Sequence, residues 1–499
     1  MILSSTLLPV VRRDRAGTSQ SLARLVALTP LGLLVAGCAT MPDMAPPPAP
    51  LAATTPAASL SLAADPGTFP ADDWWTRLGD PQLDALIAEG LANSPSVDLA
   101  AARLAAAEAQ AMQAGAATGP GLVLDASAGG QSMSQNQGFP PGLIPGSLRS
   151  TGRIAGSFGY DLDLWGRNRA ALRAARGEAD AARVDAAQAR LALATGIAAT
   201  YARLAGQMAL VEAATQALDT ARATARLTTD RVAAGLDNRG ATALADSRVA
   251  EAEVALAAAR QDELLLRHAL AALLGAGPDR GLTITAPRLT AQVVATVPAN
   301  LPLDLVGRRP DLVSARLRAQ AAADRIGIAR ADFYPSINLT AVAGLQSIGL
   351  SDLLRGSSFF SNIGPALRLP IFAQNGTEGR YRAARAGYDQ AVAHYDQTLL
   401  DALRDVADAL ATKRAIGEQL AAARAGVVSA AEARRLAELR YREGLTGQLP
   451  LLVADQGLIS ARRSLALLES QSVAADIALI RALGGGFAAD SSPETEHRP

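Results

Sequence analysis

The stretch RIAGSFGYDLDLWGRNR, residues 153–169, joins two kinds of pattern and decides the fold. Up to Leu164 its residues alternate between a bulky apolar set and a small or polar set. A period of two is typical of a β-strand with one apolar face. The bulky set is Ile154, Phe158, Tyr160, Leu162 and Leu164, and the other set is Ala155, Ser157, Gly159, Asp161 and Asp163. From Arg167 to Ala234 no Pro follows, which predicts a helix of roughly 67 residues, roughly 100 Å long.

The same order recurs later in the chain. Strand-like alternation at about 336–370 precedes a second stretch without Pro, from about Thr377 to Glu443. At a separation of 215 residues, and further on of 209, the Pro and Gly positions of the two halves coincide. The matching pairs include Pro95 with Pro310, Pro120 with Pro335, Gly129 with Gly344, Gly235 with Gly444, and Gly275 with Gly484. Chance alignment of Ala-rich helices does not explain these shared breaks, so the sequence predicts an internal duplication.

Each predicted copy consists of an opening helix, a strand pair and a long helical hairpin. The opening helices begin at Pro95 and Pro310, because Pro suits the first helical position. The hairpins turn at Gly235 and Gly444, since helices often end at Gly. The strand pairs cover about 121–164 and 336–370, and the hairpins about 167–274 and 377–483. The first repeat is placed at 73–290, the second at 291–484, and a polar tail at 485–499.

The two long helices carry bulky residues in near-heptad steps. They are Leu193, Ile197, Leu204, Met208, Val211 and Leu218 in the first helix, and Val392, Tyr395, Leu399, Val406 and Leu410 in the second. Spacing near 3.5 residues favours coiled-coil pairing, and the Ala residues between allow close approach. The predicted fold class is therefore mainly α, with coiled-coil hairpins and one small β-sheet. A β-sandwich is disfavoured because the sequence offers no further strands for a second sheet.

The N-terminus has the pattern of an export signal. Four arginines from Arg12 onward precede an apolar run over 25–34, which ends at Val-Ala-Gly-Cys38. This run is too short to span a bilayer, so residues 1–37 are predicted to be a cleaved signal peptide. The tetrapeptide resembles the bacterial lipobox, which implies that Cys38 is lipidated; the alternative is an ordinary signal peptide with an incidental Cys. Residues 38–72 are expected to be a lipid anchor and a Pro- and Ala-rich, extended tether.

Composition excludes several classes of function. The 47 basic and 47 acidic residues balance, so no nucleic-acid partner is predicted. Cys38 is the only Cys, which leaves the mature chain without a disulfide or a thiolate metal site. His268 and His394 stand alone in predicted helices and His497 lies in the polar tail, so no metal or other cofactor is expected. The sequence has no phosphate-binding Gly-rich loop and no nucleophile elbow, which argues against an enzyme.

The predicted strands are the only segments suited to a membrane, because no run of 18 apolar residues follows the signal. Four strands from one chain cannot close, and their open edges are not tolerated in a bilayer. Three chains provide twelve strands, which is a reasonable closed β-barrel. Asp125, Asp161 and Asp163 are then expected to face a watery lumen, since carboxylates are disfavoured on the lipid side. The alternative places them at the boundary between the barrel and the helices.

Several short motifs, in this order, carry a family resemblance. They are Asp73-Trp74-Trp75, Arg308-Arg309-Pro310-Asp311, Phe333-Tyr334-Pro335, Leu369-Pro370-Ile371-Phe372, and Arg440-Tyr441 before Gly444. The chain resembles a TolC-like outer membrane factor, of the lipoprotein branch (OprM/NodT-like) that serves resistance-nodulation-division (RND) efflux systems. The resemblance implies a homotrimeric channel-tunnel, with an α-barrel and a small membrane β-barrel, anchored in outer membrane lipid. It also implies a periplasmic adaptor (membrane fusion protein) and an inner-membrane RND-type pump as partners, and drugs or toxic compounds as cargo.

The resemblance also assigns roles near the two turns. Gly235 and Gly444 would form the periplasmic tip, where the tunnel closes and the adaptor docks. Members often place an apolar ring five residues after the second Gly and an acidic ring nine after it. Leu449 fits the first position, but Val453 occupies the second. Asp455 is therefore a candidate for the aperture together with Leu449 and Val453, and the alternative is a solvated helix residue.

Two rival functions remain open at this point. An exit duct for type I protein secretion would share the architecture, although the lipobox and the Arg-Arg-Pro-Asp motif favour small-molecule efflux. A periplasmic coiled-coil adaptor or scaffold would have one hairpin flanked by β-rich modules, whereas this sequence predicts two hairpins and paired strands. Fractionation distinguishes the second rival, since a scaffold would be absent from the outer membrane fraction.

Overall fold

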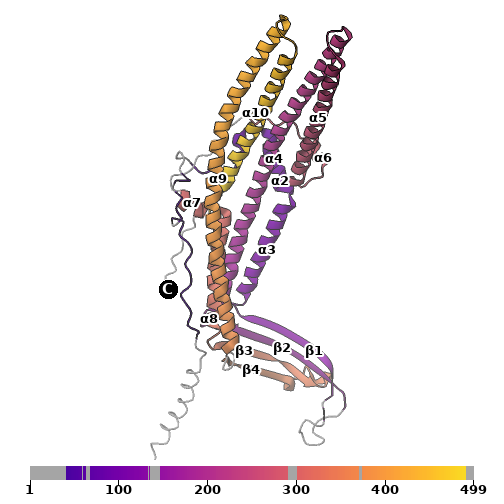
Figure 1. Ribbon diagram of the computed structural model, residues 1–499. Helices are drawn as coiled ribbons and strands as arrows, with labels where there is room; N and C mark the ends of the chain where they lie inside the picture. The colour runs from indigo at the N-terminus through magenta and orange to yellow at the C-terminus, as the bar shows by residue number, and fades with distance from the viewer. Residues whose placement is uncertain are drawn as a thin grey trace, which may run out of the picture. The chain divides into compact units, whose positions relative to one another are not determined.

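The computed structural model describes residues 41–54, 56–58, 60–62, 68–132, 134, 147–289, 301–369 and 374–489 (Figure 1). The elements in chain order are η1 (Trp74–Leu78), α2 (Pro81–Asn93), α3 (Pro95–Ala116), β1 (Gly121–Gln131), β2 (Arg149–Asp161), α4 (Arg167–Ala233), α5 (Arg239–Leu273), α6 (Asp279–Leu282), α7 (Leu301–Arg308), α8 (Pro310–Ala331), β3 (Ser336–Ile348), η2 (Leu350–Asp352), η3 (Gly356–Ser358), β4 (Phe359–Arg368), α9 (Gln374–Arg442) and α10 (Leu449–Ala482). The order of opening helix, strand pair and long hairpin therefore occurs twice. No helix in these described residues combines the length and apolar character needed to cross a membrane.

The chain forms two compact units, and each draws on both halves of the sequence. The sheet unit comprises the described residues within Met1–Pro47, Met112–Ala174 and Ala322–Gly387. The hairpin unit comprises those within Pro48–Ala111, Ala175–Ala321 and Tyr388–Pro499. The units thus do not coincide with the two repeats, because elements of one copy pack against elements of the other.

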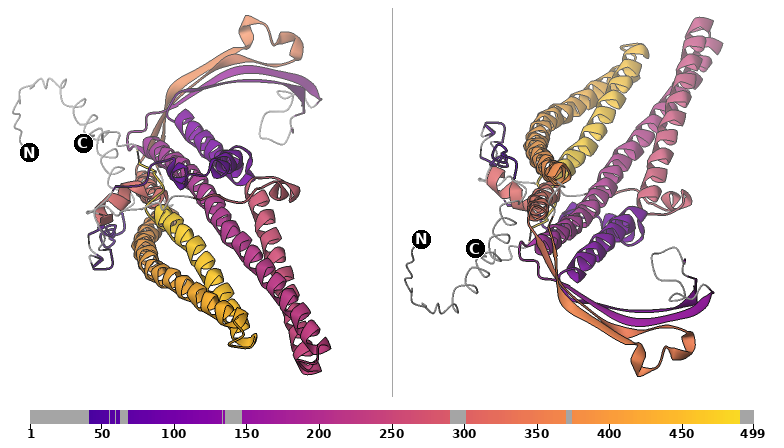
Figure 2. Two further views of the ribbon diagram at one scale, coloured as in Figure 1. Left: turned by 90° about the horizontal axis from the view of Figure 1, so that it is seen from above. Right: turned by 90° about the horizontal axis from the view of Figure 1, so that it is seen from below.

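The sheet unit contains four antiparallel strands in the order β1-β2-β3-β4, which curve together (Figure 2). The two copies meet where β2 pairs with β3, for example Phe158 opposite Ala341. Among the described strands, β1 and β4 each have a neighbour on one side only. A single chain therefore leaves two ladder edges unpaired.

The register gathers most of the bulky apolar side chains of the four strands on one face, which we call the apolar face. Opposite residues of an antiparallel pair share a face, so the pairing of Leu122, Phe158, Ala341 and Ile363 in one row defines it. Leu122 is 77% exposed and Ile363 is 78% exposed. The period-two prediction is confirmed, and the apolar face of the isolated chain is uncovered.

The hairpin unit buries several of the near-heptad residues of the long helices in two clusters. Leu193, Ile197 and Leu204 of α4 pack with residues of α2, α5 and α10 in the first cluster. Tyr395, Leu399 and Val406 of α9 pack with residues of α7, α8 and α10 in the second. In Figure 1 and both views of Figure 2, α4 lies beside α5 and α9 beside α10.

Both hairpins turn at a left-handed Gly, as predicted. Gly235 has a φ of 73° and Gly444 a φ of 71°. The N–H of Leu236 donates to the carbonyl of Arg231 at 2.8 Å, and the N–H of Leu445 donates to that of Arg440 at 2.9 Å. These are the six-to-one hydrogen bonds of a Schellman motif, which satisfies helix-end carbonyls and favours Gly at the left-handed position.

The returning helices also end at left-handed glycines, and here the glycines meet another backbone. A Cβ on Gly275 would collide with the carbonyl oxygen of Asn93 at the end of α2. A Cβ on Gly484 would collide with the carbonyl oxygen of Arg308 at the end of α7. Asn93 and Arg308 correspond in the two copies, so the duplicated sequence builds the same close contact twice.

Asp163 corrects the sequence prediction of the second strand. The period-two alternation includes Asp163 among the strand residues, but β2 ends at Asp161. Asp163 has a φ of 42°, and its carboxylate accepts the backbone N–H groups of Asn168 and Arg169 at 2.9 and 3.0 Å. It therefore caps the start of α4. Such local hydrogen bonds from backbone N–H groups to an Asp side chain compete with strand pairing, so β2 does not continue through Asp163. Desolvation raises the pKa of Asp163, but these hydrogen bonds and Arg169 outweigh it and hold the pKa below its ordinary value.

The Pro- and Ala-rich segment contacts α9, which its composition alone does not indicate. The backbone N–H of Leu51 donates to the Asp396 carboxylate at 2.7 Å, and the Tyr388 hydroxyl donates to the Pro48 carbonyl at 3.2 Å. Ala53 and Leu62 are buried in the cluster around α9. A Pro-rich segment has few backbone N–H groups and cannot form regular hydrogen bonds within itself. Side chains of α9 form hydrogen bonds with its backbone instead.

The two kinds of turn glycine predict different responses to the same substitution. Gly235→Ala meets no atom within 4 Å and carries only the left-handed strain, about 1 kcal/mol. Gly275→Ala adds a backbone collision, for a total loss of about 3 kcal/mol. In thermal unfolding of the two purified variants, the Tm of Gly275→Ala should therefore be well below that of Gly235→Ala. Equal losses would contradict the close contact with Asn93.

Candidate functional site

The ends of the two hairpins carry exposed apolar side chains. Leu236 and Leu445, which follow the two turn glycines, are 67% and 73% exposed. Beyond the turns, the hairpins differ. The side chain of Asn238 caps α5 by accepting the N–H of Ala241 at 3.2 Å, whereas Gln448 makes no side-chain cap for α10. The two hairpin ends therefore present different surfaces.

The candidate aperture residues on α10 separate into two groups. Leu449 and Val453 are four residues apart and share one side of the helix. They are 64% and 65% exposed. Asp455 is two residues beyond Val453, about 200° around the helix axis. The structure therefore brings Leu449 and Val453 together and places Asp455 on another side.

The Asp455 carboxylate forms an ion pair with α9, the other helix of its own hairpin. Its carboxylate accepts the Arg434 Nε–H of α9 at 2.8 Å, and its side chain is 17% exposed. Arg434 also pairs with Glu438 at 2.9 Å, and Glu438 pairs with Arg442 at 3.0 Å. The hydrogen bond with Asp455 is the main reason that the pKa of Arg434 lies above its ordinary value. Asp246, the counterpart of Asp455 in the first copy, is exposed.

A cavity of about 300 Å³ lies between the two hairpins near their turns. Thr224, Thr228 and Arg231 of α4 line one side, and Ala241 and Arg248 of α5 continue it. The second hairpin contributes Gly447, Gln448, Leu449 and Leu452. Leu449 thus faces the first hairpin as well as solvent.

The second face of the sheet, which we call the polar face, contains two of the three candidate lumen residues. Asp125 lies opposite Ala155, and Asp161 lies opposite Asn338, both on the side away from Leu122 and Phe158. Asp125 is exposed and Asp161 half-buried. The register therefore separates these carboxylates from the apolar face, whereas Asp163 belongs to the cap of α4.

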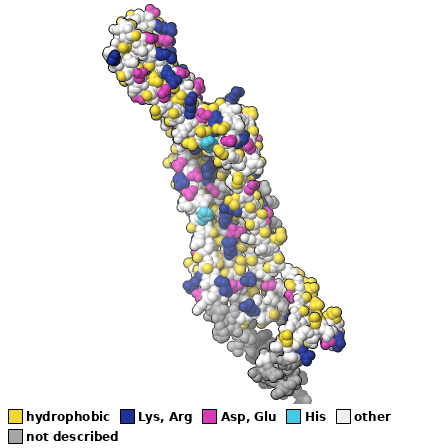
Figure 3. Space-filling model, turned by 90° about the vertical axis from the view of Figure 1, so that its right-hand side faces the viewer, with side chains coloured by type: hydrophobic (Ala, Val, Ile, Leu, Met, Phe, Trp, Pro, Cys, Tyr) yellow, Lys and Arg dark blue, Asp and Glu magenta, His cyan; other side chains and the backbone are white. Residues whose placement is uncertain are grey.

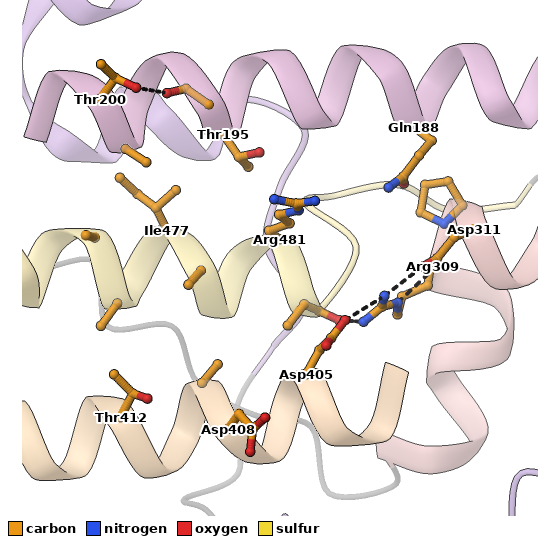
Figure 4. A pocket seen from close by; sticks show the side chains of 18 of the residues that line it. Gln188, Thr195, Thr200, Arg309, Asp311, Asp405, Asp408, Thr412, Ile477 and Arg481 are labelled. Carbon is orange, nitrogen blue, oxygen red and sulfur yellow. Dashed lines mark hydrogen bonds and ion pairs between the residues drawn. The ribbon is translucent and has the colours of Figure 1, made fainter. Parts of the chain in front are cut away.

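Arg309 organises a second, larger cavity of about 740 Å³ (Figure 4). Its guanidinium pairs with Asp311 at 2.6 Å and with Asp405 at 3.2 Å, and it donates to the Ala482 carbonyl at 3.2 Å. Burial lowers the pKa of Arg309, but the hydrogen bond and charge of Asp311 and the charge of Asp405 raise it above its ordinary value. Arg309 thus joins the start of α8 to α9 and α10. The sequence indicated only a helix start at this motif.

Two of the ion pairs are not predicted by the sequence analysis, although the spacing of residues around Gly444 could have indicated one of them. Arg434 lies ten residues before Gly444 and Asp455 eleven after it, so a hairpin turning at Gly444 places them side by side. Lys413, the only lysine of the chain, pairs with the buried Asp476 at 2.8 Å. Desolvation raises the pKa of Asp476, and Lys413 opposes that rise. No spacing rule identifies this second pair, which depends on how α9 packs on α10.

Charged side chains of both signs are interspersed along the hairpins on the face drawn in Figure 3. Cys38 and the preceding signal lie outside the described residues, as do Pro370, Ile371, Phe372 and His497. Among the described residues, no three His, Cys, Asp or Glu side chains gather in a way that could hold a metal ion.

Comparison with known proteins identifies similar chains over nearly the whole length. The family model described as "Outer membrane efflux protein" matches residues 86–276 and 291–485. The multidrug resistance outer membrane protein MdtP of Escherichia coli (strain K12) is 31% identical, over 94% of this chain and 98% of its own. The fusaric acid resistance protein FusA of Burkholderia cepacia is 33% identical, over 92% and 88%. The crystal structure of the outer membrane protein VceC of Vibrio cholerae matches with a TM-score of 0.76 and 39% identity, over 84% and 100%.

Ion selectivity in planar bilayers tests the placement of Asp455. Asp455→Asn should leave the reversal potential unchanged, because its carboxylate is paired with Arg434 and lies on a different side of α10 from Leu449 and Val453. Val453→Asp is the matched variant, which adds a carboxylate on that exposed side. It should shift the reversal potential toward cation selectivity. A shift with Asp455→Asn and none with Val453→Asp would assign the aperture to Asp455 instead.

Proposed function

The chain belongs to the outer membrane efflux protein family, and on that premise we propose that it is the homotrimeric exit duct of a tripartite efflux system. The observation that carries this proposal is the four-stranded sheet of the single chain. It has two unpaired edges and an uncovered apolar face. Closure with two further copies pairs β4 of one chain with β1 of the next and satisfies every edge.

In this arrangement the apolar face contacts lipid and the polar face lines the lumen. Lipid-exposed backbone must be fully hydrogen-bonded, which a closed sheet achieves and an open one does not. Asp125 and Asp161 then face water, where carboxylates are tolerated. Lipidation of Cys38 would add an anchor to the same outer membrane.

The helical hairpins are proposed to extend into the periplasm and to meet a periplasmic adaptor at their turns. Gly235 and Gly444 mark this tip, and Leu236 and Leu445 offer it exposed apolar side chains. Leu449 and Val453 are the proposed lining of the aperture, which makes the constriction apolar. An RND-type inner-membrane pump is the proposed source of the cargo.

Small toxic molecules are the proposed cargo. The relatives named for multidrug resistance and for fusaric acid resistance support this class over secreted proteins. Family membership also favours the outer membrane duct over a periplasmic adaptor or scaffold. Deletion of the gene should raise the accumulation of dyes and drugs in the cell, and the wild-type gene should restore efflux.

Adjacent residues on opposite faces of β1 test the orientation of the sheet. Leu124→Arg places a guanidinium on the apolar face, where it costs about 2–4 kcal/mol at the bilayer midplane. Asp125→Arg places the same group on the polar face and should be tolerated. Leu124→Arg should therefore reduce the folded protein in the outer membrane and impair efflux, while Asp125→Arg retains both. Equal effects of the two variants would contradict the assignment of the faces.

A further inference from the structure

Two arginines lie on the polar face near the loop end of the sheet, where β1 passes to β2 and β3 to β4. In the register, Arg149 lies opposite Gln131, and Arg153 lies between Ser127 and Gln346. The row between them contains Gly129, Thr151 and Ile348. These three rows contain no carboxylate among the described residues. The nearest one on this face is Asp125, in the next row.

Both arginines are exposed, and Arg153 is held over the sheet by an aromatic ring. Its guanidinium carbon lies 5.4 Å from the centroid of Phe360 on β4, within cation–π range. In the connection from β3 to β4, Arg355 pairs with Asp352 at 3.0 Å, so that connection adds no net charge. Within these three rows, the positive charge of Arg149 and Arg153 therefore has no carboxylate to balance it among the described residues.

We propose that Arg149 and Arg153 form a positively charged belt inside the outward end of the duct, which favours anionic solutes. This rests on the proposed function, in which three polar faces surround the lumen and each chain contributes both arginines. Arginine stays charged at all physiological pH values and binds carboxylates or phosphates through a planar fork. Phe360 beside Arg153 adds an aromatic surface. Aromatic carboxylates are the solutes whose chemistry fits this pair.

The belt acts over a short range, which determines how it must be measured. The Debye length is about 10 Å at 0.1 M salt, about 30 Å at 0.01 M and about 3 Å at 1 M. Conductance alone would combine the belt with any constriction at the hairpin turns. A probe attached within the three rows reports the local potential directly.

The probe is a thiol at Ser127, the register partner of Arg153 on the polar face. Ser127→Cys in reconstituted protein is treated separately with an anionic sulfonatoethyl and a cationic trimethylammonioethyl methanethiosulfonate. The rate of reaction with the anionic reagent is divided by the rate with the cationic reagent. This ratio, divided by the same ratio for a free thiol in solution, measures how strongly the local potential selects between anions and cations. The unsubstituted protein measures any background from Cys38. Ser157→Cys, on the same face but four residues further along β2, is the matched control.

At about 0.1 M salt, the Ser127→Cys ratio should favour the anionic reagent by about threefold or more. Arg149→Gln with Arg153→Gln should abolish this preference, and about 1 M salt should do so without removing the arginines. The ratio at Ser157→Cys should change less than twofold. A Ser127→Cys ratio that responds to neither treatment would overturn the belt and leave the exit duct intact. A thiol that reacts with neither reagent until the protein is unfolded would contradict the lumen-facing polar face, and with it the proposed function.

Discussion

The structure depends on one constraint, which is that every backbone N–H and C=O in a lipid environment needs a hydrogen-bond partner. Within one chain, β2 and β3 satisfy each other, but β1 and β4 each keep a free side. The register also collects Leu122, Phe158 and Ile363 on one face. A sheet closed by further copies, with its apolar face in lipid, satisfies both features. The proposed threefold duct follows from this constraint.

The two helical hairpins share the same backbone contacts at their returning helices but differ in their charged side chains. Gly275 and Gly484 approach the backbones of Asn93 and Arg308 in the same way, which fixes both returning helices. Arg309 occurs only in the second copy, because its counterpart is Ser94. The Asp455 ion pair likewise has no equivalent, since Ala225 corresponds to Arg434. Packing near the opening helices is thus repeated, while charge is distributed unequally between the hairpins.

Local patterns in the sequence predicted most of the fold. Period-two alternation predicted the strands, the long stretches without Pro predicted α4 and α9, and the recurring glycines predicted the turns. The prediction failed at Asp163, where side-chain capping of α4 competes with the ladder and ends β2 early. It also missed the packing of Leu51 and Ala53 beside α9, because composition indicates that a segment is extended but not what it contacts. Asp455 was placed in the aperture by its position after Gly444, whereas its helical phase and Arg434 decide where it points.

The most direct test of the account is the number of chains in the folded particle. Native mass spectrometry of the protein, extracted from the outer membrane in mild detergent, measures this number without assuming any function. The proposed duct should contain three copies, since three sheets of four strands close into one wall. A stable, folded monomer or dimer as the dominant species would contradict it, because β1 and β4 would then keep edges that no partner satisfies.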